Sequence, residues 1–455
     1  MAIQSKNPAT EEVLKTFNEI SDTELETKLA LAATAFELWK EFSFEARAKL
    51  FMKMSDYLQE HKAELSKLMT LEMGKPITAG DRELEKSALT CEYFAENAER
   101  FLAPEHVDTN ASESFVRFDP LGIILGVMPW NFPFWQVCRG AAPALMAGNV
   151  MVVKHASNVP QSAMAIEKAF LDCGFPAGVF QNLLLSAGRV EKVIRDPRIK
   201  GVTLTGSEKA GSEVAKIAGS EIKKSVLELG GSDPFIVFED ADLTLACEIG
   251  LASRISSNAG QACNAAKRFI VHENVADEFT RLLTESFKKL KIGDPMDPAV
   301  QIGPLSSEQI LKDVERQVNE SVKLGAKVTT GGKRWGNKGH FYEPTVLTNV
   351  KKGMPAYDEE VFGPVAAIIV FKNESEAIKI ANDTLYGLGA TIMTANTEKA
   401  KQLAPRIEAG NVFVNQQVRS DPRMPFGGIK KSGYGRELGE YGIKEFVNIK
   451  TVLIK

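Results

Sequence analysis

The chain is poor in the residues from which disulfide frameworks and metal centres are built. Its 455 residues include five cysteines and five histidines, and both types are scattered. No C-x-x-C, H-x-x-H or H-E-x-x-H pattern occurs, so we expect neither a zinc site nor any other bound metal. An odd number of dispersed thiols is typical of a reducing compartment, which predicts a cytoplasmic protein.

The sequence also lacks an excess of charge of one sign and any long apolar run. The formal net charge is −4, and both signs are mixed along the chain, so nucleic acid and anionic membrane surfaces are not expected partners. The apolar stretch 121–128 is far too short to span a bilayer. The first residues contain no apolar segment of the kind that marks a signal peptide.

Length and hydrophobic pattern predict more than one domain, of the α/β class. A chain of 455 residues exceeds one ordinary core. The first hundred residues are predicted to be helical, with a capping box at Ser21 and Glu24. From about residue 115, short apolar runs alternate with amphipathic stretches, which is typical of a parallel sheet with a nucleotide crevice at its strand ends. The alternation resumes after residue 233 and predicts a second α/β domain.

Four stretches carry side chains suited to chemistry, and each has an ordinary structural explanation as well. Cys263, in NAGQACNAAKRFIV, is either an inert core residue or a nucleophile on a turn. Asn131, in MPWNFPFW, carries an amide that can donate to an oxyanion, but the loop can equally pack in the core. Glu228 lies in an apolar strand, where burial favours a raised pKa and a general base. Ser207, in LTGSEKAG, fits either a pyrophosphate site or a plain helix N-cap.

Six motifs taken together resemble those of the aldehyde dehydrogenase superfamily. PWNFP, TGS, ELGGSDP, NAGQAC, EEVFGPV and PFGGIKKSGYGRE occur in the order and at about the spacing found in that family, over essentially the full chain. Members attack an aldehyde with a cysteine thiolate, pass a hydride to a nicotinamide and hydrolyse the resulting thioester. The resemblance implies that Cys263 is the nucleophile and Glu228 the base. It implies that Asn131 and the backbone N–H of Cys263 bind the oxyanion.

The resemblance also implies the architecture. We expect an α/β fold with a Rossmann-like cofactor domain, an α/β catalytic domain and a small β oligomerisation arm. The cofactor domain would comprise residues 1–101 and 121–230, and the catalytic domain residues 231–439. The arm would be built from residues 102–120 and 440–455. Its last segment is strand-like and needs a partner strand, within the chain or in another subunit of a homodimer or homotetramer.

The family's cofactor contacts map onto several positions of this chain. The resemblance places Lys154 at the adenine-side ribose, Trp130 near the dinucleotide and Ser207 at the pyrophosphate. It places Glu360 at the nicotinamide ribose and Phe362 against the ring. Three residues after Lys154, many NAD-using members have a glutamate, whereas this chain has Ser157. A serine can hydrogen-bond a 2′-phosphate that a carboxylate would repel. We therefore expect NADP to be preferred, with NAD still compatible.

Substrate choice is expected to depend on Trp135, Arg139, Ser420 and Phe426. Arg139 lies two helical turns after the asparagine, so it would face the same cavity, between aromatic walls. An arginine there favours an aldehyde that carries a carboxylate, and Ser420 would add a hydroxyl donor. This set resembles the bacterial succinate-semialdehyde dehydrogenases. The alternative for Arg139 is an ion pair with an internal acid. Arg419 is a second cationic candidate for the carboxylate, and its ordinary explanation is a solvated loop residue.

Other functions remain open at this point. A cysteine hydrolase or acyltransferase would need a histidine partner, and no histidine lies in any of these motifs. An idle scaffold is disfavoured by the complete set of Cys263, Glu228 and Asn131. A CoA-dependent acylating member is disfavoured by Glu228, which favours water as the acyl acceptor. Another small aldehyde remains an alternative substrate.

Overall fold

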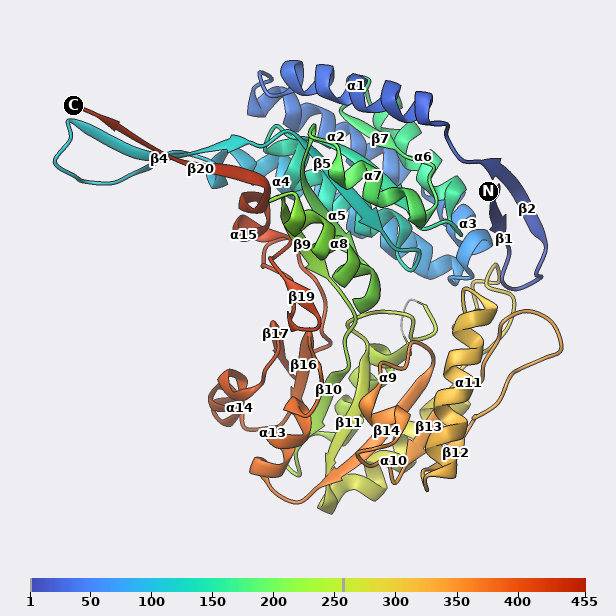
Figure 1. Ribbon diagram of the computed structural model, residues 1–455. Coiled ribbons are helices and arrows are strands. Elements are labelled where there is room, and N and C mark those ends of the chain that lie inside the picture. Colours follow the sequence, from blue (N-terminus) through green and yellow to red (C-terminus); the bar gives the residue numbers. More distant parts are fainter. Residues whose placement is uncertain (1, 256–257) are drawn as a thin grey trace.

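The computed structural model describes residues 2–255 and 258–455. Two α/β units lie one above the other in Figure 1, and a narrow β arm that ends at the C-terminus projects from the upper one. Each unit has its own central sheet and its own apolar core. The predicted α/β class, with a Rossmann-like sheet and a second α/β sheet, is confirmed.

The first sheet has six strands in the order β19-β9-β8-β5-β6-β7. All of its pairings are parallel except that of β19 with β9. The inner strands β5 and β6 are almost wholly buried, as expected when helices cover both faces of a parallel sheet. The strand bounds, in sheet order, are Gly433–Tyr434, Lys224–Glu228, Ile199–Thr205, Ile123–Met128, Val150–His155 and Phe180–Asn182.

The order of these strands reverses direction between β5 and β8. From β5 the chain moves outward through α5 (Pro133–Met146) and α6 (Pro160–Asp172), and then returns past β5 through α7 (Val190–Arg195) and α8 (Glu208–Ser220). Right-handed crossovers place the first two helices on one face and the last two on the other. The connections therefore diverge between β5 and β8 and leave a crevice at the carboxyl ends of these strands. The PWN and TGS motifs follow those two ends and meet there.

Four N-terminal helices pack against this unit, and a hairpin precedes them. The helices are α1 (Asp22–Trp39), α2 (Phe44–Glu60), α3 (Lys62–Met73) and α4 (Ile77–Phe101). The predicted capping box is present, with Ser21 Oγ accepting from Glu24 N at 3.1 Å and Glu24 Oε2 accepting from Ser21 N at 2.7 Å.

The helical prediction is wrong for residues 2–18. They form the hairpin β1 (Ala2–Lys6) and β2 (Val13–Asn18). Asn7 Oδ1 accepts from Ala9 N at 2.9 Å across Pro8. This Asx turn gives the backbone an alternative to a helix and reverses the chain between the strands.

The second sheet has seven strands in the order β12-β13-β14-β11-β10-β16-β17. Only the edge pair β12 and β13 is antiparallel. The bounds in sheet order are Lys327–Thr330, Thr345–Thr348, Val365–Phe371, Ala266–His272, Asp233–Val237, Gly389–Met393 and Asn411–Val414. The helices of this part of the chain are α9 (Leu243–Ile255), α10 (Glu273–Lys288), α11 (Glu308–Lys323), α12 (Pro355–Asp358), α13 (Glu374–Asn382), α14 (Thr397–Leu403) and α15 (Gly439–Ile443).

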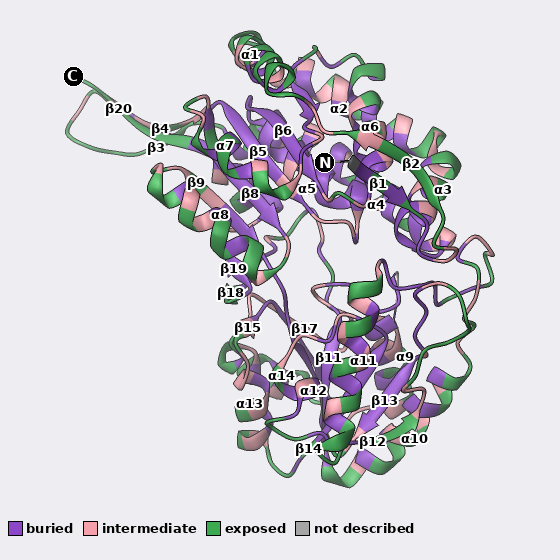
Figure 2. Cartoon of the chain, turned by 45° about the vertical axis from the view of Figure 1, so that its right-hand side comes forward, coloured by how far each residue is buried: buried purple, intermediate pink, exposed green. Residues whose placement is uncertain are grey.

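The arm is a three-stranded sheet of β20 (Val447–Ile454), β4 (Glu113–Pro120) and β3 (Glu105–His106). β20 pairs with β4 along its whole length, so the strand-like C-terminal segment has its partner within the chain. Figure 2 shows the arm as mostly exposed, in contrast to the two buried central sheets. Ile449 and Leu453 on β20 are 62% and 57% exposed, which leaves apolar side chains without cover on a protruding edge.

Two smaller features complete the fold. β15 (Tyr386–Gly387) and β18 (Ile429–Lys430) form a short antiparallel pair. The strand β19 lies within the range predicted for the catalytic domain, yet it pairs with β9 of the first sheet and so ties the two units together. None of the helices formed by residues 2–255 and 258–455 is long and apolar enough to cross a membrane.

Candidate active site

Cys263 lies between two cavities. The first, which we call the crevice cavity, is about 240 Å³ and lies at the ends of β5 and β8, where Trp130, Asn131 and Ser207 contribute to its lining. The second, which we call the basic cavity, is about 310 Å³ and is lined in part by four cationic side chains, Arg82, Lys86, Arg139 and Arg419. Cys263 lines both cavities. A thiol in this position can meet one molecule from each side.

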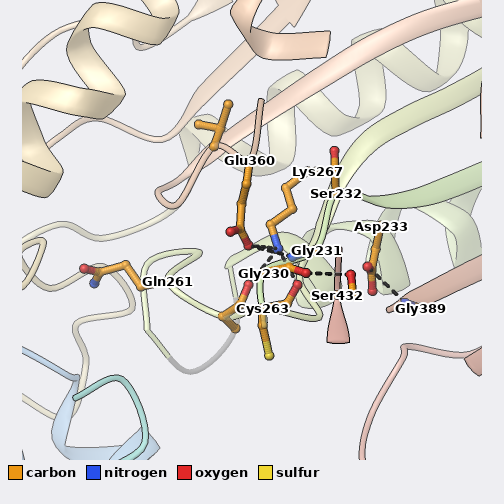
Figure 3. Close-up of polar contacts among 12 residues, drawn as sticks. Gly230, Gly231, Ser232, Asp233, Gln261, Cys263, Lys267, Glu360, Gly389 and Ser432 are labelled. Carbon is orange, nitrogen blue, oxygen red and sulfur yellow. Dashed lines mark hydrogen bonds and ion pairs between the residues drawn. The ribbon is translucent and has the colours of Figure 1, made fainter. Parts of the chain in front are cut away.

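The turn that carries Cys263 is held by one buried lysine. Lys267 Nζ donates to the carbonyl oxygens of Ala262 at 2.8 Å and Cys263 at 2.5 Å, and it lies 3.2 Å from the carboxylate of Glu360. Figure 3 shows the cysteine sulfur pointing away from this cluster. The lysine therefore fixes the backbone of the turn while leaving the thiol free to face the cavities.

The two glycines of the ELGGSDP motif allow the close approach of this cluster. A Cβ on Gly230 would overlap Glu360 Oε2, and one on Gly231 would lie 2.7 Å from the carbonyl oxygen of Cys263. Gly231 N also donates to Glu360 Oε1 at 3.0 Å. Any larger residue at either position would push the carboxylate or the cysteine turn out of place.

The surroundings of Cys263 favour the protonated thiol over the thiolate. Burial raises the pKa of Cys263 to about 11, although the positive charges of Arg139 and Lys267 act in the opposite direction. The thiolate is the nucleophilic form, so a reaction at this sulfur requires a group that takes its proton.

Asn131, the candidate oxyanion donor, lies beside the cysteine turn. Its Nδ2 donates to the carbonyl oxygen of Gln261 at 3.1 Å, and both Asn131 and Cys263 line the crevice cavity. Gln261 is itself anchored, since its Oε1 accepts from Ser306 N at 2.9 Å. An amide nitrogen carries two hydrogens, so the second remains available to an oxygen bound at Cys263.

Glu228 ends strand β9 and is 1% exposed. Neither of its carboxylate oxygens has a hydrogen-bond partner among the described residues. Burial is the main cause of a pKa well above the usual range for Glu228, and the neighbouring Glu437 raises it further. Glu228 and Cys263 are close enough to influence each other electrostatically, but Glu228 is absent from the linings of both cavities. If Glu228 acts at the thiol, a water or a rotation of its side chain has to connect the carboxylate to the sulfur.

Arg139 combines the two interpretations that its sequence position allowed. It lines the basic cavity, beside Phe426, with its guanidinium carbon 5.5 Å from the ring centroid. It also forms a buried ion pair with Glu437 and donates through Nη2 to Thr205 Oγ1 at 3.2 Å. Glu437 belongs to the GYGRE motif, but nothing in its sequence context marked it as the partner of an arginine on α5.

The crevice cavity contains most of the residues expected at a dinucleotide. Trp130 and Phe362 meet edge to face, with ring centroids 5.9 Å apart, and Glu360 lies beside them in the lining. Ser207 also lines it, but its Oγ accepts from Ala210 N at 3.3 Å, so it caps α8 as the alternative interpretation had it. The helix start nevertheless lies at the cavity, since Thr205 and Gly206 also line it.

Lys154 and Ser157 lie further along the sheet, at the carboxyl end of β6, and are outside the lining of the crevice cavity. Burial lowers the pKa of Lys154, while the negative charge of Glu19 raises it. Ser157 is exposed. A helix start, an aromatic side chain and a lysine follow the carboxyl ends of β8, β5 and β6, and Glu360 and Phe362 face them from the second unit. This set fits a nicotinamide dinucleotide.

The lining of the basic cavity includes the three substrate-site candidates Trp135, Ser420 and Phe426 and two residues of α4 that the sequence did not mark, Glu83 and Lys86. Lys86 donates through Nζ to Ser420 Oγ at 2.6 Å and lies 4.0 Å from the ring centroid of Trp135. Glu83 accepts from Trp135 N at 3.0 Å and so caps the start of α5. Both residues lie in a charged helix with no recognisable motif, so sequence reasoning had no signal for them.

Comparisons with known proteins agree with this geometry. The sequence pattern of the "Aldehyde dehydrogenase family" matches residues 1–452. A probable succinate-semialdehyde dehydrogenase [NADP(+)] from Synechocystis sp. is 51% identical over 454 residues, covering 100% of both chains. Succinate-semialdehyde dehydrogenase [NADP(+)] 1 from Mycobacterium tuberculosis is 48% identical, again over 100% of both chains.

Solved structures show the same similarity. The crystal structure of succinic semialdehyde dehydrogenase from Streptococcus pyogenes in complex with NADP+ is 41% identical, with a TM-score of 0.97 over 99% of each chain. The family pattern and these relatives extend over essentially the whole sequence, and so does the shared fold. The chain therefore belongs to the aldehyde dehydrogenase family.

Proposed function

We propose that the protein oxidises succinate semialdehyde to succinate with NADP+ as the preferred oxidant and NAD+ as a weaker alternative. The observation that carries the proposal is the position of Cys263, which lines the crevice cavity on one side and the basic cavity on the other. An aldehyde with a negative tail fits the basic cavity, and a dinucleotide fits the crevice. The names of the relatives from Synechocystis and Mycobacterium support the same substrate and cofactor.

Cys263 and Asn131 perform the first half of the reaction in this proposal. The sulfur attacks the aldehyde carbon, the thiol proton passes through a water to the solvent, and a thiohemiacetal oxyanion forms. The free N–H of the Asn131 amide and the backbone N–H of Cys263 donate to this oxyanion. When bound, the nicotinamide supplies the two-electron oxidation by accepting a hydride, and an acyl thioester on Cys263 remains.

Glu228 performs the second half. Its carboxylate takes a proton from water, the water oxygen attacks the thioester carbon, and the carbon–sulfur bond breaks to give succinate and the free thiol. A carboxyl with a raised pKa is a stronger base when ionised than an ordinary glutamate, and the burial of Glu228 supplies that shift. The absence of a fixed hydrogen-bond partner among the described residues leaves the side chain able to reach a water beside Cys263.

The proposed cofactor contacts extend along the strand ends. Trp130 and Phe362 pack against the dinucleotide, Ser207 and the start of α8 meet the pyrophosphate, and Glu360 binds the nicotinamide ribose. Lys154 and Ser157 bind the adenine-side ribose and its 2′-phosphate. Ser157 supports NADP because an exposed hydroxyl beside a lysine can donate to a phosphate.

The substrate contacts are Trp135, Arg139, Ser420 and Phe426. The two aromatic side chains wall the carbon chain, and Ser420 donates to the carboxylate. Arg139 contributes positive charge, which its pairing with Glu437 reduces. Another small aldehyde remains the alternative substrate.

The assembly and location are part of the proposal. The exposed apolar residues of β20 support pairing of the arm, residues 102–120 and 440–455, between subunits of a homodimer or homotetramer. The cofactor domain is proposed at 1–101 and 121–230, with the 433–434 strand added to its sheet, and the catalytic domain at 231–439. The scattered free thiols support a cytoplasmic location.

The test of the function is a comparison of aldehydes with either cofactor. Formation of reduced nicotinamide is followed by its absorbance for succinate semialdehyde, butanal and an aromatic aldehyde. We expect the highest kcat/KM for succinate semialdehyde with NADP+. A higher kcat/KM for butanal would reject the substrate assignment, and the absence of reduced nicotinamide with every aldehyde would reject the reaction.

A further inference from the structure

The four cations of the basic cavity are not equally available to a ligand. Arg139 is paired with Glu437, and the one acid in the lining, Glu83, is paired with the buried Lys75. Lys86 forms no ion pair with a carboxylate among the described residues. Its ammonium is thus a half-buried charge that faces the cavity without a counter-charge.

The immediate surroundings of Lys86 suit a carboxylate. Its Nζ donates to Ser420 Oγ at 2.6 Å and lies 4.0 Å from the ring centroid of Trp135. A hydroxyl that accepts from an ammonium keeps its own hydrogen for another acceptor. Lys86 and Ser420 therefore present an N–H and an O–H side by side, and the indole holds the ammonium while restricting water around it.

The electrostatics of Lys86 also indicate a missing anion. Burial and the charge of Arg139 lower the pKa of Lys86 to about 7, whereas Glu83, Asp421 and Cys263 act in the opposite direction. A carboxylate bound at the ammonium would raise that pKa again and relieve the cost of the unpaired charge. Arg82 and Arg419 are exposed, so water screens their contribution.

We propose that Lys86, acting with Ser420, directly binds the carboxylate of the substrate and determines the preference for a carboxylate-bearing aldehyde. This inference rests on the proposed function and adds to it a residue from α4, which lies outside all six motifs. Arg139, paired with Glu437, then contributes a reduced positive charge to the cavity wall, and Lys86 supplies the contact that distinguishes a charged aldehyde from a neutral one.

The experiment compares Lys86→Met, which removes the charge at similar length, with Lys86→Arg, which retains it. Lys62→Met is the matched control, because Lys62 is a partly exposed lysine outside the basic cavity whose partner Glu85 precedes Lys86 by one residue. We expect Lys86→Met to lower kcat/KM for succinate semialdehyde by about 10- to 150-fold and to leave butanal within about threefold. Lys86→Arg should retain most of the preference, and Lys62→Met should retain all of it.

A binding measurement separates this role from a structural one. Succinate should raise the melting temperature of the wild-type protein and of Lys86→Arg but not that of Lys86→Met. The ratio of kcat/KM for succinate semialdehyde to that for butanal should fall as pH rises above about 7 in the wild type, because the ammonium is lost, and it should be flat in Lys86→Met.

Two results overturn different parts of the argument. An equal fall for both aldehydes in Lys86→Met, or an unchanged succinate effect on melting, would reject Lys86 as the carboxylate contact. A wild-type protein that prefers butanal would instead reject the proposed function itself.

Discussion

Arg139 and Glu437 form a buried ion pair that joins helix α5 to the segment after β19. Arg139 lines the basic cavity whereas Glu437 does not, so the pair connects the cavity wall to the interior that also holds Glu228. The charge of Arg139 lowers the pKa of Glu228 and of Cys263, while Glu437 raises that of Glu228. After burial, this ion pair is therefore a further influence on the pKa of Glu228, and its arginine also acts on that of Cys263.

Removing one member of this pair should destabilise the protein. Arg139→Met leaves Glu437 buried without its partner, and we expect the free energy of unfolding to fall by about 3–5 kcal/mol. The double variant with Glu437→Leu removes both charges and should regain most of the loss. Urea denaturation of the three proteins measures this. If the double variant is as unstable as the single one, the coupling between the two side chains is negligible.

Glu228 should lower stability increasingly as pH rises. Its pKa is raised in the folded protein, so above the pKa of the unfolded chain the folded state retains a proton that the unfolded state has lost. Stability then falls by about 1.4 kcal/mol for each pH unit until Glu228 ionises in the folded state. Glu228→Gln lacks this loss, and its advantage over the wild type should be larger at about pH 8 than at about pH 5. A constant difference across that range would contradict the raised pKa.

Glu228→Gln should also separate the two halves of the reaction. The variant can still form the thioester on Cys263 but lacks the base that activates water. We expect a burst of reduced nicotinamide followed by turnover that is slower by roughly 100- to 10,000-fold. Rapid mixing with absorbance detection resolves both phases. Steady turnover at the wild-type rate would remove Glu228 from its proposed role.

Cys263→Ala should abolish oxidation of aldehydes, with a loss on the order of 10,000-fold or more, because no thioester can form. Cofactor affinity, measured by fluorescence titration, should change little, since the dinucleotide contacts are on other residues. Cys247→Ala is the control, because this thiol is buried on α9 away from both cavities. Comparable losses in the two variants would point to general damage rather than to the nucleophile.

Ser157→Glu should reverse the cofactor preference. A carboxylate at this exposed position would repel the 2′-phosphate of NADP+ and accept hydrogen bonds from the ribose hydroxyls of NAD+. We expect kcat/KM with NADP+ to fall by roughly 10-fold or more, and that with NAD+ to become the larger of the two. Initial rates with each cofactor test this. A wild-type preference for NAD+ would show that Lys154 and Ser157 do not form a phosphate site.

The sequence by itself determined the class of fold and marked the candidate reacting groups Cys263, Glu228 and Asn131. Buried parallel strands have near-continuous apolar runs, so β5, β6, β10 and β11 could be located from hydrophobicity alone. The motifs around Cys263 and Glu228 have backbone requirements, such as the close approach at Gly230, that leave a signature in residue type. The hairpin at 2–18 was missed because its second strand is mostly exposed and so lacks the alternation of apolar and polar residues that marks a half-buried strand.

Only the tertiary structure decided which charges meet. Arg139 and Glu437 are almost three hundred residues apart, and Lys86 and Ser420 are separated by 334. Neither pair has a local pattern, because a side chain in a helix or loop gives no sign of which distant segment will pack against it. The strands and motifs arise from short-range preferences of the backbone and from burial. The polarity of the basic cavity arises from long-range contacts. They pair Arg139 with the buried Glu437 and leave Lys86 beside Ser420 in the cavity lining.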